Sequence, residues 1–133
     1  EKIGRFWEYL FIDEVDHEFC YRLRRYGYKI IQSNEVAIDH IIGEPLKKRI
    51  MGHTFCPTNH SAFRRYYISR NAVIMAFLYP DEKKPFENRC EMLFRMIISI
   101  IFCEKDKTNK ITSIIKGISD GWKWICENKR ERN

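Results

Sequence analysis

The stretch Leu10–Ile30, which reads LFIDEVDHEFCYRLRRYGYKI, decides how the rest of the chain is interpreted. A helix is predicted from about Asp13 to Tyr26, and Gly27 is placed to end it. The prediction rests on apolar residues that recur at helical spacing, namely Ile12, Val15, Phe19 and Leu23. The first turns of this helix are unusually acidic.

Two short β-like runs follow this helix, at Tyr28 to Gln32 and at Glu35 to His40, with Ser33-Asn34 as a turn. The pattern then dissolves into a basic loop from Ile42 to Asn59, which contains glycine and proline.

Three more helices are predicted, at about Ser61 to Leu78, Phe86 to Phe102 and Lys110 to Glu127. The last of these is expected to carry one apolar stripe of Ile111, Ile114, Ile115, Ile118, Trp122 and Ile125. The expected class is therefore α+β, mainly helical, with a small β element near the start followed by three helices.

Composition narrows the possible functions. The 133 residues are 44% apolar and 14% aromatic, which favours one folded unit over disorder. The net charge of +6 fits an anionic partner, whether a nucleotide diphosphate, an anionic lipid surface or nucleic acid. Five scattered cysteines, an odd number, favour reduced thiols in the cytoplasm. The most apolar run, Met92 to Cys103, contains Arg95 and is too short to span a bilayer.

Four carboxylates crowd the start of the first helix: Asp13, Glu14, Asp16 and Glu18. They have an ordinary interpretation, because acidic side chains at a helix N-terminus complement the macrodipole. Glu18 and Arg22 are also spaced as a common surface ion pair. A catalytic interpretation is also open, because a carboxylate can act as a general base.

The wider sequence resembles family 2 glycosyltransferases, most of all their rhamnosyltransferase branch. After Leu10–Ile30, the segments that carry this resemblance occur in the family's order: IGRFWE at Ile3–Glu8, VAIDHIIG at Val36–Gly43, RRYYISRN at Arg64–Asn71 and IKGISDG at Ile115–Gly121. The resemblance implies the C-terminal part of a GT-A enzyme. Residues 1–45 would be the acceptor-side segment with the catalytic base, and residues 46–133 a C-terminal helical region. The nucleotide-binding units and DxD motif would lie upstream, so we expect no activity from this chain alone.

The resemblance also implies roles for individual residues. Asp16 aligns with the base that deprotonates the acceptor hydroxyl, although Val15 stands where many members have a Glu. Asp13 is the second candidate for the base. Asp13, Glu18 and Arg22 are expected to bind the acceptor. His40 corresponds to a ligand of a divalent metal, Mg or Mn, but a lone histidine after a strand can equally be structural.

The implied reaction is inverting transfer of a rhamnose-like or other hexose from a dTDP- or UDP-sugar. The acceptor would be a bacterial polysaccharide or a lipid-linked saccharide, and the enzyme would be cytoplasmic, at the inner face of the plasma membrane. The alternative is a non-catalytic helical module, in which the apolar helices after residue 85 mediate membrane association or formation of a homodimer. Nucleic acid is not an expected partner, because the Tyr- and Arg-rich helix lacks an RNA-binding signature. Zinc is disfavoured, because His53, Cys56 and His60 supply three ligands rather than four.

Overall fold

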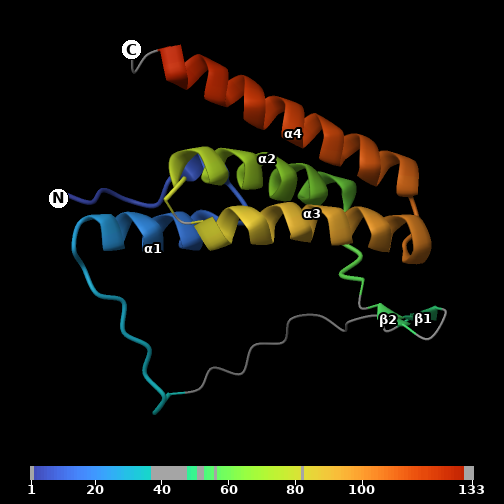
Figure 1. The fold of residues 1–133 in the computed structure, drawn as a ribbon, viewed down its shortest axis with the longest axis horizontal. Helices are drawn as coiled ribbons and strands as arrows, with labels where there is room; N and C mark the ends of the chain where they lie inside the picture. Colours follow the sequence, from blue (N-terminus) through green and yellow to red (C-terminus); the bar gives the residue numbers. More distant parts are fainter. Residues whose placement is uncertain (1, 37–47, 51–52, 56, 82, 131–133) are drawn as a thin grey trace.

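The computed structural model describes residues 2–36, 48–50, 53–55, 57–81 and 83–130. Its architecture is mainly helical, as expected (Figure 1). The elements, in chain order, are the 3-10 turn η1 (Glu8–Leu10), α1 (Val15–Arg25), β1 (Lys48–Ile50), β2 (His53–Phe55), α2 (Ala62–Leu78), α3 (Lys83–Cys103) and α4 (Lys107–Arg130). All four predicted helices are present, within a few residues of the expected bounds.

The ends of α1 and α2 show why the sequence signals were reliable. Gly27 has φ +81° and donates its N–H to the Arg24 carbonyl at 2.9 Å, while Tyr28 donates to Leu23 at 3.1 Å. These two bonds form the Schellman motif, which terminates a helix at a residue with positive φ. At the start of α2, the Ser61 hydroxyl accepts the Arg64 N–H at 3.3 Å, which is a standard N-cap.

The predicted strands near the start of the chain are wrong where the structure describes them. Residues 28–36 form no strand, and Ile31 is 87% exposed. A strand needs a hydrogen-bonded neighbour, and no other described segment pairs with this one. Residues 37–40, the end of the second predicted strand, lie outside the described part. The described β structure is instead an antiparallel hairpin within the predicted basic loop, with Arg49 opposite Thr54.

Helices α2 and α4 form the most extensive contact in the structure and pack backbone to backbone at two glycines. A Cβ atom added at Gly117 would overlap the Tyr66 carbonyl oxygen, and one at Gly121 would lie 2.9 Å from the Arg70 carbonyl oxygen. Real Cβ atoms essentially never approach backbone atoms this closely. The two glycines, one turn apart, therefore determine how closely the two helices approach.

The glycines also correct the predicted apolar stripe of α4. The buried face of this helix is centred on Gly117 and Gly121 and includes Ile114 and Ile125. Ile115 and Trp122, which were assigned to the stripe, are exposed. Hydrophobic spacing alone predicted that α4 has an apolar face. It did not predict which residues of that face are buried, because the close backbone contact at the two glycines determines the rotation of the helix.

Two apolar clusters and one buried charged cluster complete the packing. Leu10, Met75 and Tyr79 join α2 to the loop before α1 (residues 10–14, the acidic loop). Met96, Ile100 and Ile114 join α3 to α4. Between α2 and the α3–α4 corner, the buried Glu104 carboxylate accepts hydrogen bonds from Arg65 at 2.6 Å and Lys110 at 2.8 Å. Buried charges tolerate this environment only when they are paired, as these are.

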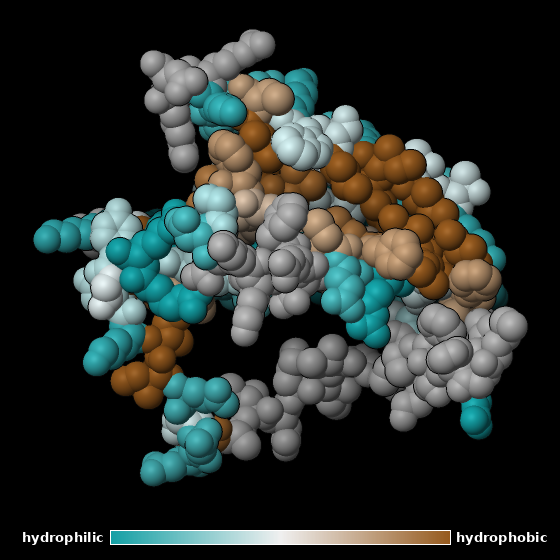
Figure 2. Space-filling model, in the orientation of Figure 1, coloured by the Kyte–Doolittle hydropathy of each residue, from teal (hydrophilic) through white to brown (hydrophobic). Residues whose placement is uncertain are grey.

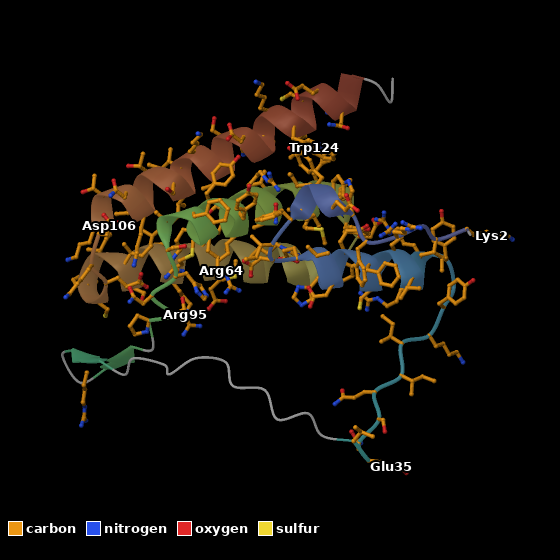
Figure 3. All side chains as sticks on the ribbon, turned by 180° about the vertical axis from the view of Figure 1, so that it is seen from behind. Lys2, Glu35, Arg64, Arg95, Asp106 and Trp124 are labelled. Atoms are coloured by element: carbon orange, nitrogen blue, oxygen red, sulfur yellow. The ribbon has the colours of Figure 1, made fainter. Side chains whose placement is uncertain are left out.

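The N-terminal segment is anchored against the far end of α4, where Trp7 and Trp124 have ring centroids 5.4 Å apart (Figure 3). None of the described helices combines the length and the apolar character needed to cross a bilayer.

We predict that Gly117→Ala destabilises the fold by about 2 kcal/mol, because overpacking against a rigid backbone costs roughly 1–3 kcal/mol. The sign of the change in the free energy of unfolding is informative. At an exposed helical site, the same Gly→Ala change would stabilise the fold by about 1 kcal/mol, because alanine has the higher helix propensity. Chemical denaturation measures the free energy of unfolding. Ser119→Ala, at an exposed position on the same helix, serves as the control and should change the value by less than about 0.5 kcal/mol. A stabilised Gly117→Ala variant would contradict the close contact.

Candidate active site

The loop that precedes α1 carries unusual backbone strain. Phe11, Asp13 and Glu14 have φ values of +61°, +63° and +63°, a region that non-glycine residues rarely adopt. Phe11 has ψ −62°, and Ile12 donates its N–H to the Leu10 carbonyl at 2.7 Å. This geometry is the rare, strained form of the γ-turn. Such strain persists only where surrounding structure enforces it, and it clusters at functional sites.

Helix α2 enforces the strained loop through Arg70 and Asn71. The Asn71 Nδ2 atom lies 2.8 Å from the Leu10 carbonyl oxygen, 2.8 Å from that of Ile12 and 3.0 Å from that of Asp13. Arg70 donates from Nε to the Asn71 Oδ1 atom at 3.1 Å, which fixes the orientation of the amide. Its Nη2 atom also donates to the Tyr9 carbonyl at 2.6 Å. Two adjacent, buried side chains thus hold the path of the whole loop.

Two of the acidic residues are paired with arginines from distant helices. The Asp13 carboxylate accepts hydrogen bonds from Arg64 Nε at 3.1 Å and Nη2 at 3.2 Å. Glu14 accepts from Arg89 Nε at 2.8 Å and Nη2 at 2.7 Å, and His17 Nδ1 lies 3.3 Å from it. Both arginine pairs are bidentate, the strongest geometry for such a contact. They connect the start of α1 to α2 and to α3.

Glu18 and Arg22, predicted to bind the acceptor, lie on a different face of α1. Glu18 is buried, and its carboxylate accepts from Tyr79 at 2.8 Å and from Arg22 at 2.9 Å. Burial, together with the Glu18 hydrogen bond, raises the pKa of the Tyr79 hydroxyl. Arg22 also donates to the carbonyl oxygens of Ile3 at 2.8 Å and Arg5 at 2.7 Å. These contacts tie the N-terminal segment to α1, and both residues line a second groove with Tyr79.

Asp16, the predicted base, stands apart from the other three carboxylates. It is exposed in the first turn of α1, and no described side chain forms a hydrogen bond or ion pair with its carboxylate. The structure therefore separates the predicted residues into three positions. Asp13 lies beside α2, Glu18 and Arg22 lie against Tyr79, and Asp16 faces solvent. His40, the predicted metal ligand, lies outside the described residues.

An open groove of about 660 Å³ lies between the acidic loop, α2 and α3. Its lining includes Asp13, Glu14 and His17 from the start of α1 and the loop before it, and Glu91 and Arg95 from α3. Figure 3 labels Arg64 and Arg95, which come from the two helices that flank this region. Asp16 is not among the residues that line the groove. It lies in the first turn of α1, directly after the loop that contains Asp13 and Glu14.

His60 lines the same groove, in surroundings that favour the neutral form of its imidazole. Partial burial lowers the pKa of this imidazole, and the positive charges of Arg64 and Arg65 lower it further. A neutral imidazole can both donate and accept a hydrogen bond, so His60 can recognise a hydroxyl group.

Candidate metal ligands do not cluster among the described residues. They contain no group of three or more His, Cys, Asp or Glu side chains placed to hold an ion. The acidic residues nearest to one another are engaged by Arg64 and Arg89 instead. The divalent metal that the resemblance implies stays a prediction, and its expected ligand His40 lies outside the described residues.

Sequence reasoning did not assign roles to Arg70, Asn71 and Arg89. The first two belong to the RRYYISRN segment, whose resemblance to the family was noted without a physical reason. The structure supplies one, because these side chains satisfy the carbonyl groups of a strained loop about 60 residues earlier in the chain. Arg89 had no local signal, since its partner Glu14 is 75 residues away.

We predict that Asn71→Ala destabilises the fold by about 2 kcal/mol, because it leaves the partly buried carbonyl groups of Ile12 and Asp13 without their described donor. Amide hydrogen exchange should also accelerate in residues 10–14. Asn109→Ala is the matched control, since Asn109 is exposed and its amide contacts only Asp106 among the described groups. Equal effects of the two substitutions would show that the loop does not depend on Asn71.

We predict that His60 titrates below 6.5, its unperturbed value, in an NMR pH titration of the imidazole protons. Because the folded state binds this proton less tightly than the unfolded state, the contribution of His60 to stability falls as the pH drops through 6.5. Arg64→Gln should raise the pKa of His60. Arg95→Gln, which alters a charge in the same groove that does not perturb His60, should leave its pKa unchanged. An unaltered pKa in the Arg64→Gln variant would remove that charge from the explanation.

Comparison with known proteins gives one informative similarity. No family model matches the chain, and no solved structure matches it significantly. The chain is 32% identical over 135 residues to the dTDP-rhamnosyl transferase RfbF of Shigella flexneri, a match that covers 98% of the chain and 43% of that protein. The chain thus spans less than half the length of this relative. Family 2 membership and the GT-A fold stay predictions, whereas the similarity supports a relationship between this chain and the glycosyltransferases.

Proposed function

We propose that the chain is the acceptor-side part of a nucleotide-sugar-dependent glycosyltransferase and that Asp16 is its catalytic base. The observation that carries the proposal is the division of the four carboxylates at the start of α1. Three of them are engaged by arginines, whereas Asp16 is exposed and has no described partner.

The pairing matters because a guanidinium or hydroxyl donor already bound to a carboxylate oxygen competes with an acceptor hydroxyl for that oxygen. Both oxygens of Asp13 and both oxygens of Glu14 accept hydrogen bonds from a guanidinium group. In Glu18, one oxygen accepts from Tyr79 and the other from Arg22. Asp16 is the carboxylate of the four with no described partner to displace, and Asp13, which is 25% exposed, is the second candidate.

The proposed reaction is inverting. An acceptor hydroxyl attacks the anomeric carbon from the face opposite the nucleotide, and the nucleotide diphosphate departs with the electrons of the bond that breaks. Asp16 accepts the hydroxyl proton as the new bond forms. The arginine-paired neighbours and the strained loop hold the start of α1 in place, which contributes through positioning rather than through proton transfer.

The partners of the whole protein follow from the same proposal. The donor is a dTDP- or UDP-sugar carrying rhamnose or another hexose, and the acceptor is a polysaccharide or a lipid-linked saccharide. Any divalent metal, Mg or Mn, would be held outside the described residues, with His40 as a proposed ligand. The proposed location is the cytoplasmic face of the membrane, where a lipid-linked acceptor is accessible.

A second candidate is a non-catalytic module for membrane association or dimerisation. It is favoured by large apolar side chains that stay exposed on α3 and α4, namely Phe94, Ile101, Phe102, Ile115 and Trp122. Figure 2 shows a band of apolar side chains over the region where these two helices meet. Lys105, Lys107, Lys116 and Lys123 are exposed on the same part of the chain and would favour an anionic bilayer. This surface is compatible with the transferase proposal, since an enzyme with a lipid-linked acceptor works at a membrane.

We predict that Asp16→Asn, in a protein that joins this chain to its upstream region, reduces transfer by at least about 100-fold, the usual contribution of a general base. Donor binding, measured by calorimetry, should stay near the wild-type value. Asp81→Asn is the control, because this carboxylate is 92% exposed and lies on the α2–α3 connection.

Retained turnover in the Asp16→Asn variant would exclude Asp16 as the base and make Asp13→Asn the next variant to measure. Absence of transfer in the wild-type protein, despite donor binding, would favour the non-catalytic module.

A further inference from the structure

Three aromatic side chains gather on the surface beside the strained loop. Phe11 from the loop and Phe63 and Tyr67 from α2 have ring centroids 4.9–6.1 Å apart. Phe11 is 64% exposed and Phe63 is 59% exposed, although large apolar side chains are usually buried in a folded domain. The Phe11 and Phe63 rings stand at 89° to each other, so the three residues form an aromatic corner rather than a flat patch.

The position of Phe11 is enforced by the protein. It occupies the centre of the strained γ-turn, with φ +61° and ψ −62°, and Asn71 holds the carbonyl groups on both sides of it. This strain directs a phenylalanine outward rather than into the core. The corner is therefore preformed within the chain, which is the usual property of a ligand site. Strain at a non-glycine residue also marks functional positions more often than purely structural ones.

Polar groups flank the aromatic corner on the side of the groove. On one side of α2, Phe63 and Tyr67 form the corner, and on another side Arg65 and Ile68 line the groove. The helical periodicity places Arg64 between these two sides around the circumference of the helix. The Arg64–Asp13 ion pair is partly exposed, at 40% and 25%. A partly exposed carboxylate and guanidinium thus lie between the aromatic rings and the groove lined by His60.

We propose that the aromatic corner is a stacking subsite for one pyranose ring of the acceptor saccharide. This proposal rests on the proposed function and names a residue set for it. One face of a pyranose presents several C–H bonds with partial positive charge, and these pack favourably on the negative face of an aromatic ring. The hydroxyl groups around the rim of the same sugar would meet the Asp13 carboxylate and the Arg64 guanidinium.

The corner shape favours a small ring over a protein surface. A protein interface requires roughly 800 Å² from each partner, whereas the corner consists of three side chains arranged around an angle. Phe11 lies two residues before Asp13 and five before Asp16, so a sugar stacked there would lie near the proposed base. The corner would then set which acceptor ring is presented for transfer.

The test is saturation-transfer NMR on this chain with methyl α-L-rhamnopyranoside, methyl β-D-glucopyranoside and methyl β-D-galactopyranoside at millimolar concentration. The expected result is transfer to the ring C–H protons of at least one sugar, with an affinity about fivefold weaker in Phe11→Ala and Phe63→Ala. Phe63→Ala leaves the strained turn untouched, so it tests the corner even where Phe11→Ala alters the loop. Phe94→Ala, at a phenylalanine of equal exposure on α3, should bind as the wild type does.

Absence of transfer to all three sugars, or equal transfer in the Phe11→Ala and Phe63→Ala variants, would overturn the proposal. Signal broadening that grows with protein concentration and disappears in Phe63→Ala would also overturn it, by showing that a second copy occupies the corner. In the longer protein, the corner proposal fails if the enzyme transfers sugar and Phe63→Ala leaves the KM for the acceptor unchanged. Failure of the proposed function appears as no transfer at all.

Discussion

The close contact between α2 and α4 is the constraint on which the remaining structure depends. Gly117 and Gly121 let the two helix backbones meet without an intervening side chain, which fixes the rotation of α2 about its own axis. That rotation aims Arg70 and Asn71 at the acidic loop, Arg64 at Asp13, and Arg65 at the buried Glu104. The geometry of the acidic loop therefore depends on small residues at two positions of α4, more than 100 residues later in the chain.

The acidic loop illustrates how structural and functional carboxylates can be distinguished within one short stretch. An isolated exposed ion pair contributes little to stability, but Arg64 and Arg89 are bidentate and connect separate helices. Glu18 is buried between Tyr79 and Arg22, where it organises the packing of the N-terminal segment. Asp16 takes part in none of these networks. Beyond the favourable interaction of an acidic side chain with the helix N-terminus, no described contact accounts for Asp16, and a chemical role would explain its presence.

The strained turn at Phe11 connects the fold to the proposed recognition of saccharide. Holding a phenylalanine at positive φ costs free energy, on the order of 1–3 kcal/mol for such residues, and the hydrogen bonds of Asn71 offset that cost. The same bonds place the aromatic ring on the surface beside a carboxylate and an arginine. The positioning of the proposed base and the recognition of the acceptor would thus both depend on Arg70 and Asn71, the buried pair of side chains at the centre of α2.

The sequence by itself determined the helices, because their periodicity, the Ser61 cap and the Gly27 terminator are local features. It also identified the acidic cluster and the relationship to glycosyltransferases, since both depend on residue order along the chain. Only the tertiary structure decided which carboxylate stays unpaired, because Arg64 and Arg89 approach from 51 and 75 residues away. It also decided that residues 28–36 form no strand and that Ile115 and Trp122 face solvent. Strand pairing and helix rotation depend on what packs against a segment, and that information is not contained in the segment itself.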